Sequence, residues 1–150
     1  MGNAIECRAR DVSWAEAPAD VAAMLGLPAG ASIQIVHCAW TAAGNPVAVS
    51  TAYLREPAAD DDRDAATPHA DSAANAAAAT AVSVEMSPPE PDVARALRLG
   101  PGEPASTVTV RFDNSATHVP AGLTVVTLRP ELFRVAIDTA EAAGPRTARR

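Results

Sequence analysis

The sequence predicts an α+β fold, with a mixed or antiparallel sheet of about six strands and two short helices. Two observations support this class: a helix followed by a hairpin, and a second copy of the same pattern later in the chain. The 150 residues suit one ordinary core. Two copies are too few for a solenoid, which needs at least three, so we interpret them as pseudo-symmetric halves of one domain. The alternative is that two similar hairpins arose by chance.

The first copy spans residues 16–57. Pro18 stands where a first-turn proline is tolerated, and glycines at 26 and 30 end the predicted helix. Residues 32–40 then form a predicted strand, a turn follows at residues 44–46, and residues 47–54 return beside it. The apolar residues of the predicted helix that share one face are Val21, Met24 and Leu25.

A strand at residues 81–86, in which Val82 and Val84 are expected to point inward, precedes the second copy. A helix is predicted over residues 90–99, ended by glycines 100 and 102, and a hairpin pairs residues 105–112 with 119–128 across a polar turn. The two copies match at one constant spacing: Leu25 with Leu97, Leu27 with Leu99, Gly30 with Gly102, and Val47 with Val119.

The remaining segments complete one predicted domain over residues 1–138, with halves at about 12–57 and 81–138. Residues 3–14 alternate loosely and suggest an edge strand, and Phe133, Val135 and Ile137 alternate as a last strand. Residues 58–80 are acidic and then rich in alanine, which predicts a flexible linker or lid. Residues 139–150 are expected to be a disordered tail.

The charge of the chain argues against direct binding to nucleic acid. The net charge is −6, and the only basic cluster is Arg146, Arg149 and Arg150. A DNA-binding surface needs clustered cations to neutralise phosphates, so we expect no direct DNA binding by this chain. No apolar run suggests a signal peptide or a membrane span, and the two cysteines lack metal-ligand spacing. A cytoplasmic protein with reduced cysteines, no membrane association and no metal site is expected.

No set of residues predicts catalysis. His37 and Cys38 are neighbours in a strand, so their side chains point to opposite faces and cannot act together. His69 lies in the predicted linker and His118 beside a turn, and the acidic run at residues 60–62 resembles no calcium loop. The glycines end helices rather than begin them, so no phosphate-binding loop is present. The expectation is a protein that is not an enzyme and uses no cofactor.

Three stretches together resemble a known family. Residues 17–54, 87–112 and 125–135 resemble the UTRA domain, the effector-sensing module of HutC-type GntR transcription regulators. The resemblance covers about residues 12–138 and implies a chorismate lyase-like fold. In that family the module binds a small molecule and signals to an N-terminal winged helix that grips DNA. No winged-helix segment precedes residue 12, so this chain resembles the sensor without the DNA-binding domain.

The departures from the family pattern concern its charged anchors. In many sugar-phosphate-sensing relatives two arginines stand at the positions of Cys38 and Trp40, and an acid stands at Ser50. A second family acid falls at about Gly122, and an arginine falls near Ser87. The resemblance therefore implies an effector that is neutral or apolar, if one is bound. The candidate ligand-binding residues are Cys38, Trp40, Ser50, Tyr53, Ser87 and Gly122.

Three functions follow from the sequence. The leading hypothesis is a non-catalytic UTRA-like sensing or dimerisation module linked to transcriptional regulation, acting as a homodimer or with a winged-helix partner. The second is a ligand-free interaction protein that modulates a full-length regulator by heterodimerisation, through exposed strand edges. The third is a lyase-like enzyme inherited with the fold, which the missing arginines disfavour.

Overall fold

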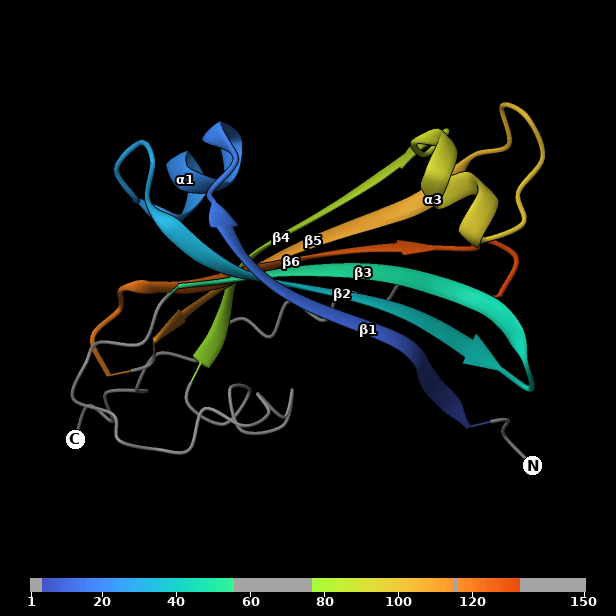
Figure 1. The fold of residues 1–150 in the computed structure, drawn as a ribbon, viewed down its shortest axis with the longest axis horizontal. Coiled ribbons are helices and arrows are strands. Elements are labelled where there is room, and N and C mark those ends of the chain that lie inside the picture. Colours follow the sequence, from blue (N-terminus) through green and yellow to red (C-terminus); the bar gives the residue numbers. More distant parts are fainter. Residues whose placement is uncertain (1–3, 56–76, 115, 133–150) are drawn as a thin grey trace, which may run out of the picture.

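Six antiparallel strands form one strongly twisted sheet, with a helix above each end of it (Figure 1). The computed structural model describes residues 4–55, 77–114 and 116–132. The strand order is β1-β2-β3-β6-β5-β4, which confirms the α+β class. The elements are β1 (Ile5–Glu16), α1 (Ala19–Leu25), β2 (Ser32–Ala42), β3 (Asn45–Arg55), β4 (Ala77–Ser87), α3 (Pro91–Ala96), β5 (Ala105–Asn114) and β6 (Pro120–Leu128).

The two halves of the chain interlock across the centre of the sheet. β3 of the first half pairs with β6 of the second, with Ala52 opposite Thr124. Helix α1 packs against β6 and helix α3 against β3, so each half supplies the helix that contacts the other half's central strand. Neither half can bury its apolar face alone, and the two therefore form one folding unit.

Both helices end in the same hydrogen-bonded motif. After α1, the N–H of Leu27 donates to the carbonyl of Ala22 at 2.8 Å; after α3, the N–H of Leu99 donates to the carbonyl of Ala94 at 2.9 Å. These are the six-to-one bonds of a Schellman ending, which needs a left-handed residue just before the donor. The two copies thus share equivalent backbone hydrogen bonds at equivalent positions. The predicted internal repeat is confirmed.

The left-handed residue differs between the two endings. In α1 it is Gly26, with φ of 62°, whereas after α3 it is Arg98, with φ of 55°. The helix predicted to continue to residue 99 ends at Ala96, because the chain turns at Arg98 instead of at the later glycines. A side chain in the left-handed region costs about 1 kcal/mol, and glycine avoids that cost.

Arg98→Gly is therefore expected to raise the free energy of unfolding by about 0.5–1 kcal/mol. Gly26→Ala, at the matching position of α1, should lower it by a similar amount. Urea denaturation of both variants beside the unmodified chain measures the two changes. A destabilising Arg98→Gly substitution would show that this side chain makes contacts worth more than its backbone strain.

Helix α1 lies over the densest apolar cluster of the molecule. Leu25 and Ile33 have no exposed surface and Leu123 is 2% exposed. Tyr53 and Val125 pack against the edge of the cluster from β3 and β6. In the other half Leu97 and Ala105 are also fully buried. The two buried leucines, Leu25 and Leu97, occupy matching positions in the repeat, one at the end of α1 and one directly after α3.

The two hairpin loops differ in length, and this changes which residues of the two copies are equivalent. The β2–β3 hairpin closes at Ala42 opposite Asn45, while the N–H of Asn114 donates to Val119 across a longer loop. Cys38 pairs with Ser50, and its counterpart Val110 pairs with Thr124. Ser50 therefore corresponds to Thr124, and the predicted match of Val47 with Val119 is wrong. The β5–β6 loop is two residues longer than the β2–β3 loop, and this shifts the correspondence between the returning strands by two positions.

Strand β4 also departs from expectation. It begins at Ala77, so residues 77–80 belong to a strand and not to the predicted linker. Val82 and Val84 are 43% and 45% exposed instead of buried, because β4 is an edge strand and both helices lie on the other side of the sheet. The rest of the predicted linker, the last strand from Phe133 and the tail lie outside the described residues.

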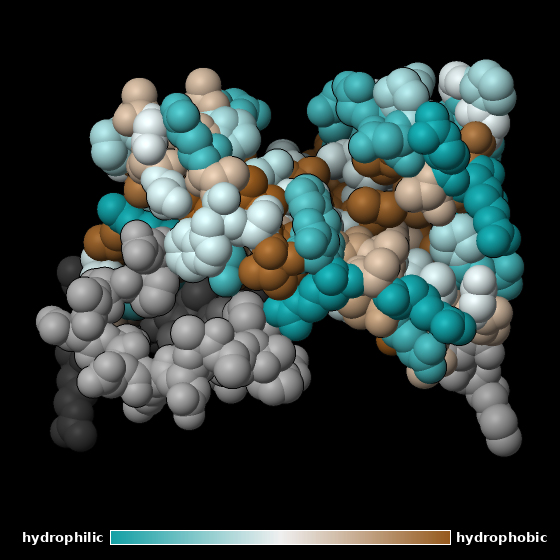
Figure 2. All heavy atoms as spheres, in the orientation of Figure 1, coloured by the Kyte–Doolittle hydropathy of each residue, from teal (hydrophilic) through white to brown (hydrophobic). Residues whose placement is uncertain are grey.

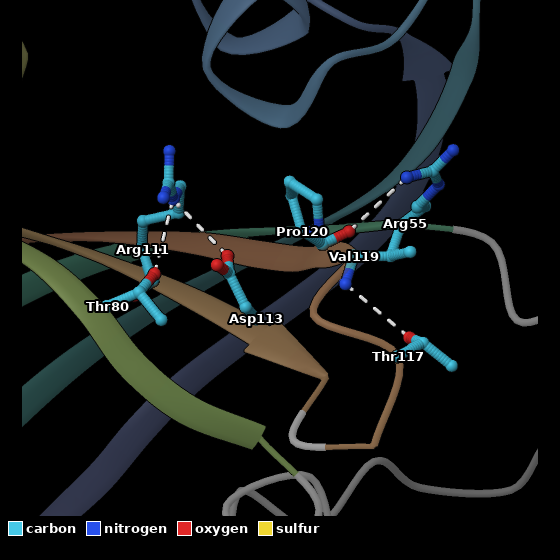
Figure 3. Close-up of polar contacts among 7 residues, drawn as sticks. All are labelled: Arg55, Thr80, Arg111, Asp113, Thr117, Val119 and Pro120. Atoms are coloured by element: carbon cyan, nitrogen blue, oxygen red, sulfur yellow. Dashed lines mark hydrogen bonds and ion pairs between the residues drawn. The ribbon is translucent and has the colours of Figure 1, made fainter.

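Polar contacts secure the β5–β6 hairpin to its neighbours (Figure 3). Arg55 at the end of β3 donates to the carbonyl of Pro120 at 3.4 Å, which adds a tie between the halves. Nε of Arg111 donates to Thr80 Oγ1 at 3.3 Å and lies 3.3 Å from Asp113 Oδ1 as an ion pair. These contacts tie the β5–β6 hairpin to both β3 and β4.

Candidate functional site

The sheet has two unlike faces, which alternate along each strand. The helix face carries Ile33, Tyr53 and Leu123 beneath α1. The opposite face, here called the groove face, carries Trp40 and Ser50, together with their paired neighbours on β1, β5 and β6. Figure 2 shows the helices of the helix face as two separate projections with largely hydrophilic surfaces and apolar residues between and below them.

A shallow groove of about 250 Å³ lies on the groove face, at the end of the sheet where β1, β2, β3 and β6 meet. Trp40 and Ser50 lie side by side in it, and Nε1 of Trp40 donates to Oγ of Ser50 at 2.8 Å. The bond satisfies the indole donor, so the ring itself presents an apolar surface. The lining residues are Ile5, Trp40, Ala48, Ser50, Thr124, Val126 and Leu128, none of which is charged.

Cys38 stands next to the groove, opposite Ser50 in the β2–β3 pairing. Burial raises the pKa of the Cys38 thiol, and a hydrogen bond and charge interaction with Cys7 raise it further, against smaller lowering effects of Arg10 and Ser50. The thiol is thus favoured in its neutral form. The structure places three of the predicted residues, Cys38, Trp40 and Ser50, in one cluster.

The other three predicted residues lie elsewhere. Tyr53 is on the helix face beside α1, where burial and then the charge of Asp20 raise the pKa of its hydroxyl. Ser87 ends β4 opposite Ala105. Gly122 is buried, and a Cβ there would lie 3.1 Å from the carbonyl oxygen of Tyr53, so the position has little room for a side chain. The ligand-binding role assigned to all six remains a prediction.

Five of the groove's lining residues were not singled out from the sequence: Ile5, Ala48, Thr124, Val126 and Leu128. Three of them come from β6, whose pairing with β3 joins strands that are far apart in the chain. The alternation of Thr124, Val126 and Leu128 is a signal that they share a face. It does not reveal which strand they adjoin.

The predicted separation of His37 and Cys38 is confirmed. Nδ1 of His37 lies 2.9 Å from Oγ1 of Thr51 on the helix face, while Cys38 pairs with Ser50 on the groove face. Among the described residues, no group of three or more His, Cys, Asp or Glu side chains converges as a metal site would require. Within the same residues, no helix is long and apolar enough to cross a membrane.

A larger hollow, of about 380 Å³, lies beside α3 and is lined mainly by prolines and glycines. Arg95 also lines it, and the N–H of Gly100 donates to the Glu103 carboxylate at 2.7 Å in the local turn. None of the residues that the sequence predicts for ligand binding lines it. The position of the predicted ligand-binding residues therefore favours the smaller groove at Trp40 over this hollow.

A comparison with protein families matches the UTRA domain over residues 1–134. The chain belongs to the UTRA domain family. The resemblance found in the sequence is thereby confirmed, and it extends over β1, which the motifs did not include. A comparison with curated proteins finds no match.

Solved structures similar to this UTRA domain share its fold at low sequence identity. A GntR-family transcriptional regulator from Bacillus cereus has a TM-score of 0.75 at 13% identity, covering 89% of this chain and 97% of that one. The effector domain of PhnF from Mycobacterium smegmatis has a TM-score of 0.65 at 19% identity, covering 91% and 86%. These neighbours show that this UTRA domain has the fold of effector domains in GntR-family regulators.

Proposed function

We propose that this UTRA domain is a non-catalytic sensor of a neutral or apolar small molecule in transcriptional regulation of the GntR/HutC type. The uncharged groove at Trp40 is the observation that carries the proposal. A sugar phosphate or dicarboxylate needs charge-assisted donors, such as paired guanidinium groups, and the lining residues offer none. An indole face and one serine hydroxyl suit a ligand with an apolar body and one polar group.

The size of the groove further restricts the class of small molecule that can bind. Sites for drug-sized ligands occupy about 300–1,000 Å³, so a groove of about 250 Å³ suits a small effector. Ser50 Oγ already accepts from Trp40 and lies opposite Cys38. The O–H of Ser50 is therefore the group that can donate to a hydroxyl or carbonyl oxygen of a ligand. This chemistry favours a small alcohol, ketone or aromatic metabolite over an ion.

Binding is tested by a thermal-shift and tryptophan-fluorescence screen against apolar metabolites, neutral amino acids and sugar phosphates. We expect stabilisation by an uncharged compound, and Trp40→Ala should weaken that binding at least about tenfold. Trp14→Ala is the matched control, because Trp14 is 52% exposed and does not line the groove. Stabilisation by sugar phosphates alone would contradict the proposal.

The exposed edge of the sheet favours a second candidate, a module that acts by pairing with another chain. All twelve residues of β1 are exposed, and its outer edge carries no strand in the described part of the protein. Such an edge can add a strand from a second copy or from a winged-helix regulator. Co-purification of a winged-helix protein, with no response to any class of small molecule, would favour this candidate. A chain that stays monomeric without a partner would argue against it.

A further inference from the structure

Two free cysteines that are far apart in the sequence lie on neighbouring strands of the groove face. Cys7 pairs with Trp40 in the β1–β2 register and Cys38 pairs with Arg10, so Cys7 and Cys38 are diagonal neighbours on one face. Burial raises the pKa of the Cys38 thiol, and Cys7 lies close enough to raise it further, while the thiol of Cys7 donates to the carbonyl of Ala9 at 3.5 Å. Cys7 is exposed and Cys38 is half-buried.

The backbone between the two cysteines is irregular at this point. The β1–β2 register shifts between Cys7 and Ala9, so that β1 carries one extra residue there. Bulges bend a strand and increase its twist. Because β1 is an edge strand with every residue exposed, it can shift at small cost. A diagonal pair that would be slightly too distant in a regular ladder can therefore come within reach of a disulfide.

A chain of contacts joins this cysteine pair to the groove. Cys38 pairs with Ser50 across the β2–β3 ladder, and Ser50 accepts from the Trp40 indole at 2.8 Å. The contacts run from an exposed thiol on the edge strand to the aromatic floor of the groove. A change at Cys38 therefore alters the surroundings of the Ser50 hydroxyl, which accepts the hydrogen bond from Trp40.

We propose that Cys7 and Cys38 form a reversible intramolecular disulfide when a peroxide oxidises the chain, and that this bond changes the groove. Peroxide oxidises the exposed Cys7 thiol to a sulfenic acid and is reduced to water. The Cys38 thiol then attacks that sulfur, the S–S bond forms and a second water leaves. A dithiol reductant reverses the bond. The effect on effector binding rests on the proposed function, whereas the disulfide itself does not.

Hydrogen peroxide treatment of the full chain tests the covalent step. Alkylation and mass spectrometry should show that both thiols are lost together and that a disulfide joins the peptides containing Cys7 and Cys38. Dithiothreitol should restore both thiols. Cys38→Ser removes the resolving thiol, so labelling of Cys7 by a sulfenic-acid reagent should rise at least about tenfold over the unmodified chain. A link between two chains, or sulfinic acid on Cys7 as the main product of the unmodified chain, would overturn the proposal.

The coupling to the groove has its own measurement, which needs no effector. In a Trp14→Phe background the emission comes from Trp40, since the chain has two tryptophans. Peroxide should change that emission reversibly, and the further substitution Cys7→Ser should abolish the change. An intact disulfide with unchanged Trp40 emission would refute the coupling. If the disulfide and the emission change occur but no compound binds, the proposed sensing function fails while this inference stands.

Discussion

Leu25→Ala and Leu97→Ala are each expected to lower the free energy of unfolding by about 3 kcal/mol. Both side chains are fully buried; Leu25 is the last residue of α1, and Leu97 directly follows α3. Truncation removes apolar burial and leaves a cavity that the surrounding strands can fill only partly. A helix of six or seven residues has no stability of its own, so its place on the sheet depends on these contacts.

Met24→Ala is the matched control for this prediction. Met24 precedes Leu25 in the same helix but is 44% exposed, so its truncation should cost less than about 1 kcal/mol. Because each helix contacts the other half's central strand, both leucine variants should unfold in one transition. A separate early transition in Leu97→Ala would show that the second half unfolds on its own, against the interlocked arrangement.

The helices and their endings could be predicted from the sequence because their signals are local. Apolar spacing and the following glycines placed Leu25 and Leu97 at equivalent positions, and the structure buries both. The exact end of α3 could not be predicted, since Arg98 adopts a conformation that usually indicates glycine. The match of Val47 with Val119 was wrong because the two hairpin loops differ in length. Loop length changes which residues of two strands pair, but it leaves the apolar pattern within each strand unchanged.

The candidate site was predictable only in part. Trp40 and Ser50 come together because their strands form a hairpin whose register follows from its short turn. Tyr53 could have been assigned to the other face from the sequence, since Ser50 and Tyr53 are an odd number of residues apart on one strand. The contribution of β6 could not be predicted, because its pairing with β3 joins segments that no local pattern connects.

Cys38→Arg combined with Trp40→Arg is expected to convert the groove into an anion site. Both positions lie on the groove face, and Arg10 faces Cys38 across the β1–β2 pair. Two added guanidinium groups on this surface would form a suitable arrangement for a phosphate. Glucosamine 6-phosphate should bind the double variant at least about tenfold more tightly than the unmodified chain, a gain of about 1.4 kcal/mol.

The binding is measured by isothermal titration calorimetry at two salt concentrations. Electrostatic attraction on an exposed face is screened by ions, so the gain should shrink as salt is raised. The pair Cys38→Ser with Trp40→Gln removes the same side chains without adding charge, and should show no gain. Binding of the phosphate by the unmodified chain as tight as by the double-arginine variant would mean that the natural groove already holds anions by another route. The proposal of a neutral or apolar effector would then be wrong.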